Sequence, residues 1–278
     1  MINKYLMLFN VILSFIFVYN IIALEIDNIT QKKIVIVIPS YNNQKWYTKN
    51  LDSVFSQNYQ NYHVIYVDDT SPDGTGKYVK EYVNTHNLHD NITLIINEKR
   101  QGALANLYYA IHSCNDTDII VTLDGDDWFA HENVLQRINS AYANPNVWLT
   151  YGQFKRYPQG SIGWCRQTPK NVVAQNTFRK HKYPPSHLRT FYAALFKKIK
   201  IEDLMKDGQF YTMSWDLAMM FPMIEMAKDR FQFISEPLYI YNLANNINDH
   251  KVSQRTQKSL ADEIRSLPPY QPLETLFN

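Results

Sequence analysis

The sequence predicts an α/β protein with a mostly parallel central sheet flanked by helices. Apolar runs of strand length alternate with helix-like segments from Lys33 to Leu123, which is typical of parallel sheets covered by helices on both faces. Polar residues directly follow each apolar run. With 278 residues and 45% hydrophobic content, the chain can bury the core of one large domain or of two closely packed halves.

The alternation assigns each element in turn. Short runs rich in Ile, Val and Leu predict strands, and longer segments with apolar residues at helical spacing predict helices. The expected elements, in chain order, are a strand at 34–38, a helix at 46–56, a strand at 63–67, a helix at 77–85, a strand at 93–96, a helix at 102–112 and a strand at 118–123.

The polar residues after the strands predict a single binding site. Ligands of such sheets bind at the carboxyl ends of the strands. The four ends read Pro-Ser-Tyr-Asn at 39–42, Asp-Asp-Thr-Ser at 68–71, Asn-Glu-Lys-Arg at 97–100 and Asp-Gly-Asp-Asp at 124–127. We therefore expect these segments to lie together.

The last of these ends holds three carboxylates, Asp124, Asp126 and Asp127, around Gly125. Such a cluster repels itself unless a cation is present. Strand alternation would point Asp124 and Asp126 the same way, and Gly125 would let the backbone approach a ligand closely. Oxygen ligands of this kind suit Mg²⁺ or Mn²⁺ holding a diphosphate. The alternative is an acidic turn that only caps the next helix.

The first strand-to-helix turn contains no glycine, since the first glycine of the chain is Gly74. A Rossmann fingerprint, a P-loop and the glycine-rich loop of a sugar nucleotidyltransferase all need glycines there, so all three are disfavoured. The turn instead offers Pro39, Ser40 and Tyr41. Tyr41 can stack on a base that the neighbouring polar groups hydrogen-bond.

Three ordered segments, 37–42, 67–75 and 123–127, resemble inverting glycosyltransferases of family 2, which have the nucleotide-diphospho-sugar transferase fold of type A. The resemblance implies that Asp69 accepts the N3–H of a uracil-type base. It also implies that Asp124 and Asp126, or Asp126 and Asp127, hold the ribose and a metal on the diphosphate. The donor-binding residues implied are Pro39, Tyr41, Asp69, Arg100 and Asp124, and the implied metal ligands are Asp126, Asp127 and His250.

Transfer from a nucleotide-sugar also needs a base for the acceptor hydroxyl, and Asp216 is the candidate. We expect Ser214 to cap a helix whose first turn contains Asp216, where the helix dipole favours the ionised carboxylate. The alternative is that Asp216 is only a favourable first-turn residue. Family members often carry Glu-Asp here, and Trp215 replaces the Glu. Glu225 is a reserve candidate that we expect to be structural or solvated.

Two further places have both a functional and a simpler interpretation. In the late segment around Tyr239–Asn242 and 246–251, which resembles a loop that returns to the donor site in some relatives, His250 can be a third metal ligand or simply exposed. His187 and Arg189 can face the acceptor or a phosphate, or neither.

The N-terminus predicts a signal peptide or signal anchor at residues 1–24. An apolar run from Leu6 to Ala23 follows Lys4, and acidic residues follow the run. We expect the remainder to be in the lumen of the secretory pathway or secreted, with membrane association if the segment is retained. Three sequons, at Asn28, Asn91 and Asn115, fit a luminal glycoprotein. A buried core helix is the alternative for residues 6–23.

Within this scheme, residues 25–252 form the transferase domain, with a nucleotide-sugar half at 33–135 and an acceptor half at 136–252. Residues 253–278 show no packed-core pattern and predict a loosely attached extension. A net charge of +2 without a polybasic stripe disfavours nucleic acid as partner. Cys114 and Cys165 either pair or remain free thiols.

The sequence therefore predicts a metal-dependent inverting glycosyltransferase with a UDP-sugar donor and a Mn²⁺ or Mg²⁺ cofactor. The acceptor can be a glycan, a protein or a lipid. The alternative from another class is a catalytically silent carbohydrate-binding or structural glycoprotein with the same fold.

Overall fold

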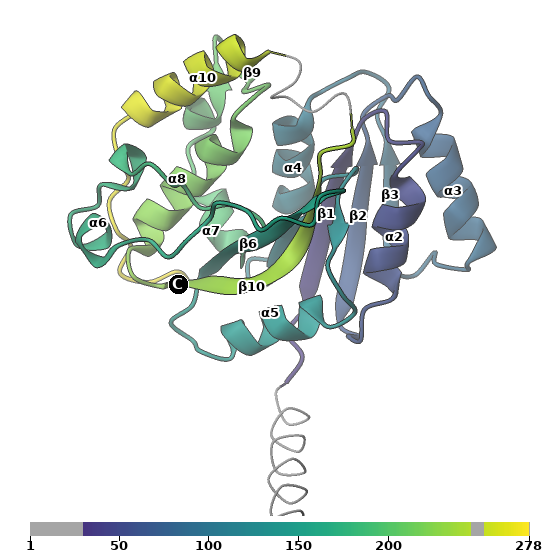
Figure 1. Cartoon of the computed structure of the whole chain (residues 1–278), viewed down its shortest axis with the longest axis horizontal. Coiled ribbons are helices and arrows are strands. Elements are labelled where there is room, and N and C mark those ends of the chain that lie inside the picture. Colours follow the sequence, from purple (N-terminus) through teal and green to yellow (C-terminus); the bar gives the residue numbers. More distant parts are fainter. Residues whose placement is uncertain (1–29, 246–252, 278) are drawn as a thin grey trace, which may run out of the picture.

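The computed structural model describes residues 30–245 and 253–277 (Figure 1). The predicted N-terminal signal segment and His250 lie outside these residues. Within them, every helix is too short or too polar to traverse a lipid bilayer.

The first half of the chain forms the predicted alternation. Strands β1 (Ile34–Ser40), β2 (Tyr62–Asp68), β3 (Ile92–Ile96) and β4 (Ile119–Thr122) pair in parallel, with β1 between β2 and β4. The intervening helices are α2 (Tyr47–Phe55), α3 (Thr75–Thr85) and α4 (Ala103–His112). All seven residues of β1 are buried, as expected for a central strand covered on both faces.

The second half extends the same sheet, in which eight strands follow the order β3-β2-β1-β4-β7-β6-β10-β5. Strand β7 (Arg189–Tyr192) is antiparallel to β4 and to β6 (Leu149–Tyr157). Strand β10 (Phe231–Asn242) pairs in parallel with β6 and antiparallel with the short β5 (Trp128–Phe129). Because β5 directly follows the acidic segment, this pairing brings the end of β10 beside it.

Helices of the second half pack beside the sheet around one buried helix, α8 (Trp215–Ala227), in which residues 217–227 are all buried (Figure 1). A hairpin of β8 (Met205–Lys206) and β9 (Gln209–Phe210) precedes α8. Asp207 and Gly208 both have positive φ in its two-residue turn, the conformation that tight hairpins require. The other helical segments are α5 (Val134–Tyr142), α6 (Lys170–Ala174), α7 (Ala193–Lys197), α10 (Gln254–Ser266) and the short 3₁₀ segments η1 (Phe178–Lys180) and η2 (Ile201–Leu204).

The expectation of a loosely attached C-terminal extension was wrong, because α10 packs on α8 through buried Leu260 and Ile264. Arg179 fixes this contact. Its guanidinium binds both carboxylate oxygens of Glu225 at 2.7 and 2.9 Å and donates to the Ile264 carbonyl at 2.6 Å. Glu225 is thus structural, as expected. The prediction failed because only two residues of α10, Leu260 and Ile264, are buried, too few to give a clear apolar pattern in the sequence.

Cys114 and Cys165 are free thiols in this structure. Cys165 is buried, and burial raises the pKa of its thiol to about 11. The free-thiol interpretation therefore holds for the folded protein.

Candidate active site

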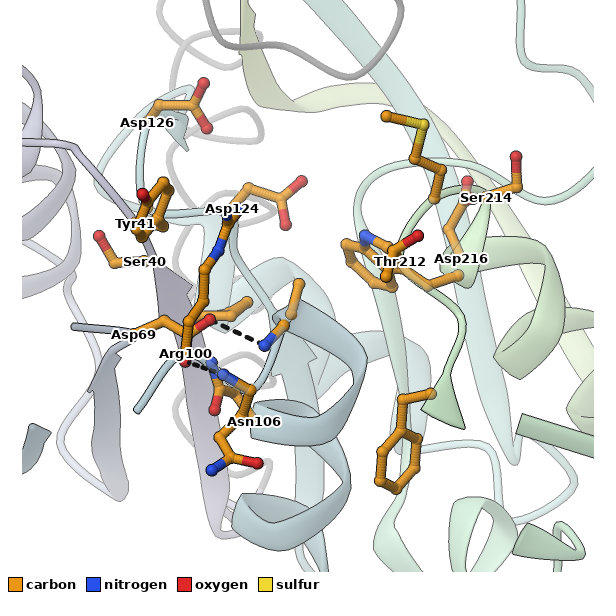
Figure 2. A pocket seen from close by; sticks show the side chains of 18 of the residues that line it. Ser40, Tyr41, Asp69, Arg100, Asn106, Asp124, Asp126, Thr212, Ser214 and Asp216 are labelled. Atoms are coloured by element: carbon orange, nitrogen blue, oxygen red, sulfur yellow. Dashed lines mark hydrogen bonds between the residues drawn. The ribbon is translucent and has the colours of Figure 1, made fainter. Parts of the chain in front are cut away.

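A cavity of about 1130 Å³ opens at the carboxyl ends of β1, β2 and β4, where the sequence predicts a site. The predicted base Asp216 lines it. So do seven of the residues predicted to bind the donor or the metal, namely Pro39, Tyr41, Asp69, Arg100, Asp124, Asp126 and Asp127. Figure 2 shows two facing sides: Asp69, Arg100, Asp124 and Asp126 on one, and Thr212, Ser214 and Asp216 on the other. We call residues 124–127 the acidic loop and residues 205–216 the far wall.

The acidic loop is a turn and not the end of a strand, so the expected strand alternation does not apply. Strand β4 ends at Thr122, and the Asp127 N–H donates to the Asp124 carbonyl at 3.0 Å. A Cβ at Gly125 would lie 2.6 Å from Ser40 Oγ and 2.7 Å from Asn43 Nδ2, so Gly125 lets the acidic loop pack closely against the β1 turn.

Buried polar groups hold the acidic loop from behind. Asn50 of α2 is fully buried, and its Nδ2 donates to the carbonyls of Asp124 at 3.1 Å and Asp127 at 2.7 Å. From the end of β10, Asn242 Nδ2 donates to the Asp126 carbonyl at 3.0 Å. The predicted return of the Tyr239–Asn242 segment to this site is therefore confirmed. Asn50 was missed, although an Asn among the apolar positions of a helix is a usable signal.

Asp127 is turned into the protein. Its Oδ2 accepts from the Tyr239 hydroxyl at 2.5 Å and its Oδ1 from the Asn242 N–H at 2.7 Å, and its side chain is 1% exposed. Burial raises the pKa of the Asp127 carboxyl well above its usual range, and the charges of Asp126 and Asp124 raise it further. Asp127 therefore holds the acidic loop in shape through both of its oxygens, and its role as a metal ligand stays a prediction.

Asp124 and Asp126 are the carboxylates that suit a divalent ion. Burial raises the pKa of the Asp124 carboxyl, and the positive charge of Arg189 opposes that rise. Asp126 is half-buried, and its Oδ2 accepts from Asn245 Nδ2 at 2.7 Å. Across residues 30–245 and 253–277 no three acidic, His or Cys side chains converge on a common point. Two carboxylates completed by substrate phosphates are a usual Mg²⁺ arrangement, so the donor set fits such an ion.

Asp69 holds the loop between β3 and α4 in place by accepting hydrogen bonds from it. Its Oδ1 accepts from Asn97 Nδ2 and the Gln101 N–H, and its Oδ2 accepts from the Gly102 N–H, each at 2.8 Å. A carboxylate offers about four lone-pair sites, so Oδ2 retains one for a further donor. The side chain thus shapes the loop that carries Arg100 and also faces the cavity.

Tyr41 and Arg100 form one stacked unit across the cavity mouth. The Arg100 guanidinium lies 3.8 Å from the centroid of the Tyr41 ring, within the range of a cation–π contact. This joins the turn after β1 to the loop after β3, and places a positive charge on the side of the cavity that holds the carboxylates.

Asp216 lies in the first turn of α8, as predicted, but Ser214 does not cap the helix with its side chain. The Ser214 hydroxyl instead donates to the Gln257 carbonyl of α10 at 3.0 Å. Buried Arg189 holds Asp216 through Nη2, which donates to Oδ2 at 3.0 Å and to His187 Nε2 at 3.3 Å. Asp216 remains one-third exposed to the cavity.

His187 also lines the cavity, and its ring is held by neighbouring side chains. It stacks on Tyr239 with ring centroids 4.4 Å apart, and burial lowers its pKa well below the usual range, with Arg189 contributing. A neutral imidazole orients the guanidinium, which in turn orients Asp216. Sequence spacing gave no sign of this chain of contacts.

The family model described as glycosyl transferase family 2 matches residues 35–205, which is well over half of the chain. Among curated relatives, the UDP-Glc:alpha-D-GlcNAc-diphosphoundecaprenol beta-1,3-glucosyltransferase WfgD of Escherichia coli is 30% identical over 139 residues, covering 50% of this chain and 52% of WfgD. The matched regions span between 14% and 63% of the curated relatives' lengths.

Two solved structures share the fold. The mannosyltransferase PcManGT from Pyrobaculum calidifontis, in complex with GDP-Man and Mn²⁺, has a TM-score of 0.58 and 21% identity over 86% of this chain and 66% of that one. S. aureus TarS 1-349 in complex with UDP-GlcNAc has a TM-score of 0.58 and 17% identity over 84% of this chain and 65% of that one. Fold, family match and predicted motifs agree, and the chain belongs to glycosyl transferase family 2.

Proposed function

We propose that the protein transfers a sugar from a UDP-sugar to an acceptor hydroxyl, with a divalent ion and with inversion at the anomeric carbon. The observation that carries this proposal is the position of Asp216, held by Arg189 across one cavity from Asp124 and Asp126 (Figure 2). A base on one side and diphosphate-binding carboxylates on the other is the arrangement that a single in-line displacement needs.

The donor would bind over the carboxyl ends of β1, β2 and β4. Asp69 Oδ2 has acceptor capacity left for the N3–H of uracil, and the Tyr41–Arg100 unit offers an aromatic face and a positive charge. Asp124 and Asp126 would hold the divalent ion, which when bound neutralises charge on the diphosphate. Asp127 would keep the loop in shape through its hydrogen bonds to Tyr239 and Asn242.

In the chemical step, the Asp216 carboxylate takes the proton of the acceptor hydroxyl. The acceptor oxygen bonds to the anomeric carbon as the bond from that carbon to the diphosphate oxygen breaks, and UDP leaves. Arg189 keeps Asp216 aimed at the cavity through a charge-assisted hydrogen bond to its Oδ2. Attack from the side opposite the leaving group inverts the configuration of that carbon.

The test is transfer by the full chain from UDP- and GDP-sugars to a panel of glycan, peptide and lipid acceptors with Mn²⁺. The proposal expects nucleotide release that depends on acceptor, with a UDP donor, and a product whose anomeric configuration by NMR is opposite to that of the donor. Retained configuration would overturn the inverting mechanism. UDP binding without any turnover would instead favour the silent carbohydrate-binding alternative. The luminal location remains a prediction.

A further inference from the structure

Part of the cavity is lined by residues of α4 and of the far wall, and we call this part the recess. Ala103, Asn106 and Tyr109 line it from α4, and their spacing of three residues puts them on one face of that helix. At its end the Tyr109 ring meets the Phe210 ring edge to face, with centroids 6.3 Å apart.

Tyr109 is exposed to an unusual degree for an aromatic residue that faces a cavity. Its exposed fraction is 61%, the largest among the exposed large apolar side chains of the described residues. Its neighbour Tyr108 packs inward against Phe196 and Phe210, so Tyr109 is not needed to fill the core. An exposed ring beside a binding cavity is available to a ligand.

Polar and apolar groups alternate around this recess. Met205, Phe210 and Met213 supply apolar surface, whereas Gln209, Thr212 and Gln257 supply hydrogen-bonding groups. A pyranose ring has this mixed character, with C–H groups on its faces and hydroxyls at its edge. A hydrocarbon chain would instead leave the amide and hydroxyl groups without partners, which is costly.

The charges around the recess disfavour an anionic ligand. Of the described residues that line the cavity, Arg100 and Arg189 are the arginines and none is a lysine. Arg100 stacks on Tyr41 on the donor side, and buried Arg189 bonds Asp216 and His187. The far wall itself therefore brings no uncommitted cation from the described residues to this surface.

From this geometry we infer that the acceptor is a neutral glycan, with one pyranose ring stacked on Tyr109 against Phe210 and the next placing its hydroxyl at Asp216. The inference rests on the proposed function and adds the substrate class. The Tyr109 ring provides apolar contact, and Gln257 of α10 reads hydroxyls at the edge of the sugar.

The test is saturation-transfer NMR on the full chain with UDP and Mg²⁺. The probes are the methyl glycosides of glucose, galactose, mannose and N-acetylglucosamine, together with disaccharides built from them. We expect at least one probe to receive saturation, most strongly on the C–H protons of one ring face. Tyr109→Ala should weaken its binding by roughly tenfold, the order expected for loss of an aromatic contact.

Two variants separate ring stacking from general damage. Tyr109→Phe retains the ring and should bind the probe like the wild type. Phe277→Ala removes another exposed ring, which is 44% exposed, contacts Tyr192 and does not line the cavity, and it should also leave binding unchanged.

Calorimetric titration of the same samples with UDP measures donor binding, and so tests the proposed function independently of the acceptor. Normal UDP binding with no saturation of any neutral sugar, or saturation that Tyr109→Ala leaves unchanged, would overturn the glycan inference alone. A detergent-solubilised polyprenyl phosphate that binds in place of the sugars would also overturn it, in favour of a lipid acceptor. Loss of UDP binding in the folded wild type would count against the proposed function instead.

Discussion

The two sides of the cavity are built differently. The acidic loop is held by hydrogen bonds from buried groups of α2 and β10. Gly125 lets it pack closely against the turn after β1. The far wall is a short hairpin and a helix start, half-exposed, tied to α10 through Ser214 and Glu263. The family match ends at residue 205, where the far wall begins. Under the proposed function, the firmly held acidic loop would bind the donor, and the more exposed far wall would contact the acceptor.

The largest expected effect is a loss of transfer rate in Asp216→Asn without a loss of UDP affinity. Asp216→Asn retains the size of the side chain but removes the base, so transfer should fall roughly 10²- to 10⁴-fold, the usual contribution of general base catalysis. UDP affinity should be unchanged, because Asp216 lies across the cavity from the donor carboxylates. Steady-state rates and calorimetry measure the two quantities. Asp116→Asn, at an exposed ion pair with Lys197, is the matched control.

The next largest effect is expected from removing the Asn50 side chain, which donates hydrogen bonds to the acidic loop. Asn50→Ala leaves the carbonyls of Asp124 and Asp127 without this buried donor, so the free energy of unfolding should fall by roughly 2–4 kcal/mol. UDP binding should weaken as well, since the loop loses its fixed shape. Urea denaturation measures the first effect. Asn58→Ala, whose side chain bonds exposed Asn133, should change neither quantity.

Gly125→Ala tests the close packing of the acidic loop against the turn after β1. The added Cβ would meet Ser40 Oγ and Asn43 Nδ2 well inside contact distance, so the variant should lose about 1–3 kcal/mol of stability through overpacking. It should also bind UDP less tightly. Unchanged stability and UDP affinity would show that the acidic loop is not held against the β1 turn.

The smallest effect concerns the far wall. Glu263 of α10 accepts from the Tyr211 hydroxyl at 3.2 Å and pairs with Lys206 of the hairpin. Glu263→Gln should raise the KM for the acceptor severalfold, while the melting temperature and the UDP affinity stay near wild type. Glu81→Gln, at an exposed pair with Lys77 on α3, is the control. An equal rise for donor and acceptor KM would contradict the division between the two sides.

The nucleotide half was predictable from sequence because its signals are local. Continuous apolar runs predicted β1 to β4, and the residues after each run supplied the carboxylates, Tyr41 and Arg100 on one side of the cavity. The acceptor half was less predictable because its elements are joined by contacts distant in sequence. Arg179 binds Glu225 and Ile264, and Ser214 bonds Gln257, neither of which follows from periodicity. The roles of Asp127 and Gly125 also depend on neighbours, such as Tyr239 and Ser40, that only the fold brings close.

Calorimetric titration of the full chain with UDP is the most direct test, performed with Mn²⁺ and again with EDTA, on the wild type and on Asp216→Asn. We predict Mn²⁺-dependent UDP binding of equal affinity in both proteins, although the variant transfers sugar roughly 10²- to 10⁴-fold more slowly than the wild type. Equal UDP binding in EDTA would contradict the assignment of Asp124 and Asp126 to a divalent ion. No UDP binding by the folded protein would contradict the donor site itself.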